Sequence, residues 1–342
     1  MSTRQALLIG TLPGESAEEA VGTAVELLGP HLATVPDGET GSRRIWIVGL
    51  INSFRDHPDL EVAKDGDMHD YQSQLHFRVR KGHRLTGDSF DLGYLAAYRE
   101  NRPVVDRLTA AAGIRPAYQV GIPGDLNLAM FATGPTRMLR TRPAFTAATL
   151  RDIRQIQAES DGDVVFQIEV PAETVSVTMA GPLAPLAASW MAGSVLKLVK
   201  EAPEGARFGI HLCLGDLGHR ALGKPRTAAP LVKLANAIAR KWPAGRTFEY
   251  LHAPLAQGEL PPSLDEAFYR PLSALRLPAR TRFVAGFLHE GRSIEEQRQI
   301  LGIIERATGK TVDVAAACGL GRRDPEAAYA TMRQARDLCA ES

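Results

Sequence analysis

The sequence predicts an α/β fold, a (β/α)8 TIM barrel formed by a single domain over residues 1–342. Eight short runs rich in Val, Ile, Leu or Phe alternate with stretches of helical character, and this alternation predicts a parallel sheet closed on itself. The chain length suits one such barrel. An open doubly wound sheet is the alternative. We favour the barrel because no G-x-G-x-x-G turn follows the first run.

The eight predicted strands are distributed along the whole chain. They are Gln5–Pro13, Leu32–Glu39, Pro116–Gly124, Asp163–Pro171, Arg207–Leu214, Arg246–Ala253, Thr281–Glu290 and Thr311–Cys318. Several helix starts between them carry a capping box, in which Ser is followed three residues later by Glu, or an Asp-Pro pair. These starts are Ser16 with Glu19, Ser263 with Glu266, Ser293 with Glu296, and Asp324 with Pro325.

Residues 41–115, between the second and third predicted strands, are too many for a simple connection. We interpret this segment as an insertion, partly helical, that covers the mouth of the barrel. The alternative is a surface excursion with no part in the site, and the sequence leaves both interpretations open.

Composition and charge exclude several classes of partner. A hydrophobic fraction of 44% supports a sizeable buried core. The formal net charge is +1 and the Lys and Arg residues are scattered, so neither nucleic acid nor an acidic membrane surface is an expected partner. No apolar run reaches the length of a membrane span, and the first residues lack the pattern of a signal peptide. We therefore expect a cytoplasmic protein.

The chain contains three cysteines, Cys213, Cys318 and Cys339. An odd number in a reducing compartment argues against a disulfide framework and leaves metal binding, catalysis or burial. Cys339 lies beside Leu338 in the last predicted helix, and we interpret it as a cysteine on a helix face.

Each predicted strand becomes polar or Gly-rich at its carboxyl end, which is where a barrel carries its active site. The residues at these ends include Gly10 and Thr11, Glu39, Asp125, Glu169, His211 and Cys213, Glu249, His289, and Cys318. We therefore expect these side chains to gather at one rim.

His211 and Cys213 are two residues apart in a predicted strand, so their side chains point to the same face. Glu249 and Cys318 end the sixth and eighth predicted strands at the same rim. Imidazole, thiolate and carboxylate groups are the ligands that zinc takes in tetrahedral sites. The four residues therefore predict a Zn²⁺ site. The alternative, which we favour less, is that they are unrelated core residues.

Several segments, taken in order, resemble the catalytic C-terminal barrel of cobalamin-independent methionine synthase, in the superfamily that also contains uroporphyrinogen decarboxylase. Leu8-Ile9-Gly10-Thr11-Leu12-Pro13 is similar to the family's I-G-S-F-P, Asp37-Gly38-Glu39 with Arg43 to its G-E-x-x-R, and Gln167–Ala172 to its Q-I-D-E-P-A. Further along, His211-x-Cys213 resembles the family's H-x-C, and Glu249 resembles its glutamate ligand at a strand end. His289 is similar to the His of its D-I-H-S. Cys318-Gly319-Leu320 with Arg323 is similar to its C-G-L-x-x-R.

This resemblance implies a methyltransferase in which His211, Cys213, Glu249 and Cys318 hold zinc. It also implies that Glu39 and Glu169 bind the ammonium group of an amino-acid thiol such as homocysteine, helped by the backbone around Gly10 and Thr11. His289 would then lie on the leaving side of the methyl donor, which could be a folate, a methyl-corrinoid protein or another compound.

The sequence departs from the family in three places. Glu169 stands where the family has Asp, and Val170 replaces the second acid of its D-E-P. The N-terminal half of the full-length enzymes, which helps to hold the folate, has no counterpart in this sequence. The insertion at 41–115 in turn has no counterpart in the family. These departures leave the amino-acid pocket and the methyl donor open.

The predicted chemistry follows from the metal. Coordination to zinc deprotonates a thiol that is mostly protonated at neutral pH, and the resulting thiolate attacks the donor methyl group. His289 would be the general acid, or else a rim histidine bonded to backbone. Glu39 and Glu169 could instead pair with Arg43 or Arg44. A zinc-dependent lyase or hydrolase of a small molecule is the second hypothesis, and a corrinoid- or tetrapyrrole-binding protein is the third.

Overall fold

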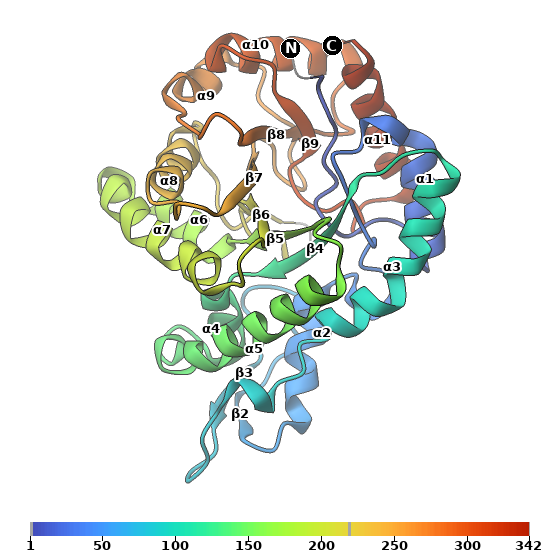
Figure 1. Ribbon diagram of the computed structural model, residues 1–342. Helices are drawn as coiled ribbons and strands as arrows, with labels where there is room; N and C mark the ends of the chain where they lie inside the picture. The colour runs from blue at the N-terminus through green and yellow to red at the C-terminus, as the bar shows by residue number, and fades with distance from the viewer. Residues whose placement is uncertain (1–2, 218–219, 342) are drawn as a thin grey trace.

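Seven of the eight predicted strands form one curled parallel sheet in the computed structural model, which describes residues 3–217 and 220–341 (Figure 1). The strand order is β1-β4-β5-β6-β7-β8-β9, so each strand lies beside the next one of the sheet along the chain. The strands are β1 (Thr34–Pro36), β4 (Ala117–Pro123), β5 (Val164–Glu169), β6 (Arg207–His211), β7 (Thr247–Pro254), β8 (Arg282–Leu288) and β9 (Asp313–Ala316).

The first predicted strand, Gln5–Pro13, joins the two edges of this sheet without becoming a regular strand. Ala6 makes parallel bridges to Leu32 on one side and to Val314 on the other. Beyond these bridges, side chains replace the backbone as hydrogen-bond partners: the carbonyl oxygens of Leu8 and Ile9 accept from the Gln119 amide at 2.9 and 3.1 Å. The segment is therefore extended and held in place, but its backbone is not paired in a ladder.

Helices surround the sheet (Figure 1). They are α1 (Ala17–Leu28), α3 (Tyr94–Ala111), α4 (Asp125–Thr133), α5 (Met138–Glu159), α6 (Pro171–Met179), α7 (Ala184–Glu201), α8 (Ala229–Arg240), α9 (Glu266–Tyr269), α10 (Ile294–Thr308) and α11 (Pro325–Ala340). By length and composition alone the stretch Gly181–Glu201 could cross a membrane, but half of it is buried inside the protein, and α7 packs against α6 and α8 as a core helix does.

The predicted helix starts are confirmed at three of four positions. Ser16, Ser293 and Asp324 accept hydrogen bonds from the first backbone N–H groups of α1, α10 and α11. The prediction at Ser263 was wrong, because α9 begins two residues later with Asp265 as its cap. The Ser263 hydroxyl accepts from the Asp265 N–H instead.

The segment 41–115 contains the helix α2 (Trp46–Ser53), a hairpin of β2 (Leu60–Lys64) and β3 (His76–Val79), and finally α3. The hairpin lies at the lower end of the view in Figure 1, below α4 and α5. This part of the chain builds a second hydrophobic cluster together with α4 and α5, in which Phe54, Phe77 and Phe90 are buried. The last third of the segment is α3, which packs against α1, α5 and β4 as one of the surrounding helices.

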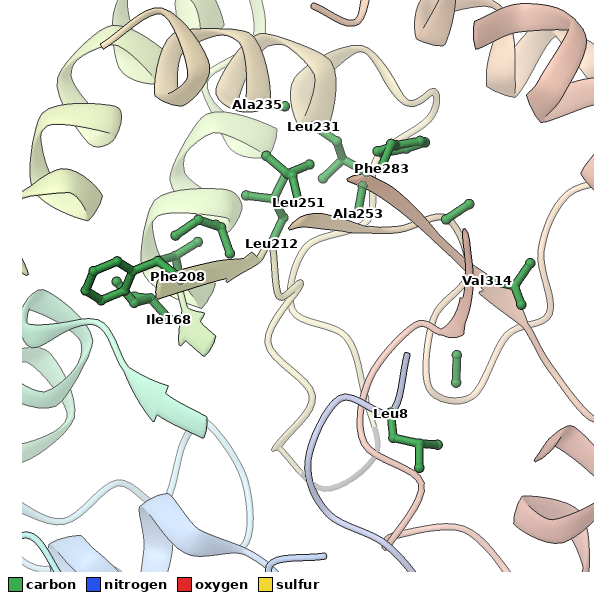
Figure 2. Close-up of a cluster of buried hydrophobic side chains, with 14 of the residues drawn as sticks. Leu8, Ile168, Phe208, Leu212, Leu231, Ala235, Leu251, Ala253, Phe283 and Val314 are labelled. Carbon is green, nitrogen blue, oxygen red and sulfur yellow. The ribbon is translucent and has the colours of Figure 1, made fainter. Parts of the chain in front are cut away.

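Alternation along the strands separates an apolar layer under the helices from the interior of the curled sheet. Leu251 and Ala253 of β7 lie in the large cluster with Leu231 and Ala235 of α8 (Figure 2). Successive strand residues point to opposite faces, so the neighbouring Tyr250 faces inward with a small interior cluster that includes Ile9 and Val165. The same alternation turns His252 inward.

Candidate metal centre and active site

Three of the four predicted zinc ligands meet at the carboxyl ends of β6 and β9. His211 is the last residue of β6, Cys213 follows two residues later, and Cys318 lies two residues after β9. Their ligand atoms all lie within 4.8 Å of one another, and the Cys318 Sγ is 3.9 Å from the His211 Nε2. Residues more than a hundred positions apart thus form one buried donor group.

The chemistry of this group fits zinc. Zinc bonds of about 2.3 Å to sulfur and about 2.0 Å to imidazole nitrogen place tetrahedral donors about 3.5 Å apart, close to the sulfur–nitrogen separation found here. Without a metal, the Cys213 thiol hydrogen-bonds Cys318, and this contact lowers the pKa of the Cys318 thiol well below its ordinary value, with smaller contributions from Arg322 and His211. The same contact, together with burial, raises the pKa of Cys213.

His252 fixes the ring orientation of His211. Its Nε2 is 3.0 Å from the Ala316 carbonyl, which can only accept, so Nε2 carries the hydrogen and donates. Burial, and the charge of His211, lower the pKa of His252 well below its usual value, so the ring is neutral and its Nδ1 accepts. The His211 Nδ1, 2.7 Å away, donates to it, which leaves the His211 Nε2 free as a ligand on the side of the cysteines.

Glu249, the fourth predicted ligand, does not join this group, and this part of the prediction needs correction. Strand β7 runs on to Pro254, so Glu249 is its third residue and lies towards the amino end. Its carboxylate accepts from Arg207, the first residue of β6, at 2.6 Å. The residue of β7 in register with His211 is His252, so the sequence placed the strand end several residues too early.

His289, the predicted general acid, is held by backbone on both ring nitrogens. Its Nε2 is 3.2 Å from the Gly258 carbonyl, and its Nδ1 accepts from the Gly291 N–H at 2.9 Å. The residue is buried and is not among the described residues that line the cavity at the cysteines. The geometry therefore matches the alternative interpretation, a rim histidine bonded to backbone.

The carboxylates of Glu39 and Glu169 both approach Gly121. A Cβ on Gly121 would be 2.7 Å from the Glu39 Oε1 and 3.7 Å from the Glu169 Oε1, so only glycine permits this approach. Burial raises the pKa of Glu39 to about 8, with Asp37 contributing in the same direction. Burial and the nearby Glu39 also raise the pKa of Glu169. Two buried acids of this kind form a receptor for a cation.

The backbone at Glu39 is in the left-handed region, with φ of 47°. A non-glycine residue there costs on the order of 1–3 kcal/mol and needs support from its surroundings. The support comes from Asp37, whose Oδ1 accepts the Glu39 N–H at 3.0 Å and whose Oδ2 is held by Arg43 at 2.5 Å. Arg43 therefore pairs with Asp37 and not with the Glu39 carboxylate.

Gly10 lies beside the Glu39 carboxylate, and Thr11 contacts the loop that follows Cys318. A Cβ on Gly10 would be 2.9 Å from the Glu39 Oε2, which places the Gly10 backbone against that carboxylate. The Thr11 carbonyl accepts from the N–H groups of Leu320 and Gly321 at 2.8 and 2.9 Å. The first segment thus connects the Glu39 carboxylate to the loop that follows Cys318.

Arg322, for which the sequence left open a substrate carboxylate partner or a purely surface role, lies at this site. Its Nη2 is 3.1 Å from the Cys318 Sγ and 2.8 Å from the Asp216 Oδ2. Asp216 belongs to the loop after β6 and Arg322 to the loop after β9. The ion pair therefore joins the two loops that carry the cysteines.

Several of these side chains line one cavity. Glu169, Cys213, Cys318, Asp216 and Arg322 supply its charged and sulfur-bearing part. Apolar residues form much of the remaining wall, and three lining residues come from the segment 41–115. The apolar wall contains Pro123, Phe131, Pro171 and Leu217. The residues from the segment 41–115 are Ile45, Ile47 and Tyr71.

Comparisons with known proteins find likeness at the level of the fold. The structure matches a B12-independent methionine synthase from Shewanella sp. W3-18-1 in complex with selenomethionine, with a TM-score of 0.60 and 10% identity over 99% of this chain and 98% of that one. It also matches a putative vitamin-B12 independent methionine synthase from Listeria monocytogenes, with a TM-score of 0.55 and 12% identity over 95% and 85% of the two chains. No protein-family model and no curated protein matches the sequence.

Proposed function

We propose that this protein transfers a methyl or similar small alkyl group to a thiol at a zinc site formed by His211, Cys213 and Cys318. The observation that carries the proposal is the convergence of these three donors beside a cavity that Cys213, Cys318 and the acid Glu169 line. The fold-level likeness to structures titled methionine synthases agrees with it.

When bound, zinc would keep an acceptor thiol in its thiolate form at neutral pH. The protein's own part is to hold the donors in place. His252 fixes the tautomer of His211 by accepting from its Nδ1–H, so that the Nε2 lone pair faces the cysteines, and the Gly215 N–H donates to the Cys213 Sγ at 3.4 Å. Two thiolate ligands would leave the metal a weak Lewis acid, which favours alkyl transfer over hydrolysis.

The acceptor class that we propose is an amino-acid thiol. Glu169 lines the cavity at the cysteines, and the carboxylates of Glu169 and Glu39 both approach Gly121. An ammonium group placed between them would allow the acids to ionise, because its charge offsets the burial that raises their pKa. The apolar wall, including Ile45 and Phe131, would keep water from a reactive methyl donor.

The metal assignment is tested by elemental analysis of purified wild-type protein and three Cys→Ser variants. We expect about one equivalent of zinc in the wild type and in Cys339→Ser, because Cys339 is buried in α11 away from the donor group. Cys213→Ser and Cys318→Ser should lose most of the metal. Full zinc occupancy in both variants would overturn the assignment.

The reaction class is tested on cobalt-substituted protein, in which the metal's absorption reports its ligands. Adding L-homocysteine should change the spectrum as a thiolate binds, and a methyl donor should then yield the thioether. A spectrum that no thiol alters, with hydrolysis of an ester or amide substrate instead, would favour the hydrolase hypothesis.

A further inference from the structure

Arg322 presents hydrogen-bond donors that the protein itself does not use. A guanidinium group carries five N–H donors, and the two contacts of Arg322, to Asp216 and to Cys318, both involve Nη2. Nε is buried with no partner, and no described residue accepts a hydrogen bond from Nη1. The side chain is only 17% exposed, so these donors are also largely removed from bulk water, which is unfavourable unless a ligand satisfies them.

We propose that Arg322 is a specificity-determining residue that binds the carboxylate of the acceptor thiol. This inference rests on the proposed function, because it takes the thiol to lie at His211, Cys213 and Cys318. Both two-nitrogen faces of the guanidinium include Nη2, which Asp216 and Cys318 occupy. The contact that we expect is therefore one charge-assisted hydrogen bond from Nη1 to a carboxylate oxygen.

The position of Arg322 is fixed before any ligand binds. Asp216, only 7% exposed, holds Nη2 at 2.8 Å from the opposite loop, and the Cys318 Sγ holds the same nitrogen at 3.1 Å. A side chain held in this way loses little rotamer freedom on binding. The unused Nη1 atom is then presented in one orientation.

The charges along the cavity match a zwitterion. Among the described residues that line it, Arg322 is the single basic one, and Glu169 and Asp216 are the acidic ones. Asp216 pairs with Arg322, which leaves Glu169 for the ammonium group. The thiol would lie at the cysteines, the ammonium at Glu169 and Glu39, and the carboxylate at Arg322. Arg322 also lies close enough to both acids to oppose the rise in their pKa.

A positioning role is the competing explanation, in which Arg322 only stabilises the Cys318 thiolate. That role would affect the metal and every thiol equally, whatever the thiol carries at its far end. The carboxylate role affects one class of thiol. The experiment therefore compares two ligands on the same protein.

The test is a titration of cobalt-substituted protein with L-homocysteine and with L-homocysteine amide, in which the carboxylate is neutral. For the wild type we expect the carboxylate form to bind about 10- to 100-fold more tightly, the range for one charge-assisted contact. Arg322→Gln should reduce this ratio to about one. Arg207→Gln, which removes an arginine that pairs with Glu249, should keep the wild-type ratio.

Each outcome decides between the proposals. A wild-type ratio in Arg322→Gln, or equal binding of both ligands by the wild type, would overturn the role of Arg322 and leave the proposed function standing. A spectrum that neither thiol changes in the wild type would overturn both. If Arg322→Gln does not fold, Arg322→Met removes the charge but keeps an unbranched side chain, and a ratio unchanged from the wild type would count against the proposal.

Discussion

The ring nitrogens Nδ1 of His211 and His252 lie 2.7 Å apart on neighbouring strands, and one proton occupies the space between them. The Ala316 carbonyl decides which ring carries it, because it accepts from the opposite nitrogen of His252. A backbone oxygen of β9 thus sets the proton position on a residue of β6 through a side chain of β7. Strand β9 leads directly to Cys318, so the same strands orient two of the three donors.

Replacing His252 should weaken zinc binding. His252→Phe keeps an aromatic ring but removes the acceptor for the His211 Nδ1–H, so the His211 ring is no longer fixed. Loss of such a partner typically costs about 10- to 100-fold in metal affinity. Competition with a chromophoric chelator measures the change. His289→Asn is the matched control, a buried histidine bonded to backbone elsewhere, and should bind zinc as the wild type does. Wild-type affinity in His252→Phe would contradict the assignment.

Replacing Glu249 should leave the metal in place. Glu249→Gln breaks an ion pair with Arg207 in which both side chains are about a quarter to a third exposed, and pairs of this kind contribute about 0–1 kcal/mol. We expect a full complement of zinc by elemental analysis and a loss of unfolding free energy below about 1 kcal/mol. Loss of the zinc would mean that Glu249 is a ligand after all.

Replacing Glu169 should weaken the binding of amino-acid thiols selectively. Glu169→Gln removes the acid proposed to receive the ammonium group, and one such contact corresponds to about 10- to 100-fold in affinity. Spectral titration of the cobalt protein with L-homocysteine measures this loss. Zinc content should be unchanged, and 3-mercaptopropionate, which has no amine, should bind as to the wild type. Equal losses for both thiols would point to a general structural effect.

Replacing Glu39 should stabilise the metal-free, ligand-free protein at alkaline pH. Burial raises the pKa of Glu39 from 4.5 to about 8 in the folded state. At a pH between these two values, the Glu39 carboxyl is ionised in the unfolded chain and protonated in the folded protein. The unfolding free energy contributed by this group therefore falls as pH rises from 4.5 to 8, by about 1.4 kcal/mol per unit of pKa difference. The unfolding free energy of Glu39→Gln should exceed that of the wild type at pH 8.5, and the difference should be smaller at pH 5.

Urea denaturation at both pH values, after treatment with a chelator, measures this difference. A gain that is the same at pH 5 and pH 8.5 would show that Glu39 is not a buried acid of raised pKa. The same acid should release a proton when an amino-acid thiol binds near neutral pH, because the ammonium group favours its ionised form. Calorimetry in buffers of different ionisation enthalpy detects that proton.

The order of strands and the position of the site could be predicted because they depend on local patterns. Runs of apolar residues gave seven strands in their observed order, and the H-x-C spacing placed His211 and Cys213 together. Cys318 could be added because parallel strands bring their carboxyl ends to one rim. His252 lies in a predicted strand, so its inward orientation could have been inferred from the alternation of side chains. Its contact with His211 could not, because that depends on the register of β7 against β6.

What the sequence determined by itself is the alternation of strands and helices, the rim on which polar residues gather, and three zinc-ligand candidates. The tertiary structure decided which residues at that rim meet. It moved Glu249 to the other end of β7, placed His252 beside His211, and brought Arg322 to Cys318. The physical reason is that residue type and spacing fix only the face of a strand to which a side chain points. Register between strands and the path of loops depend on packing and hydrogen bonds between distant parts of the chain.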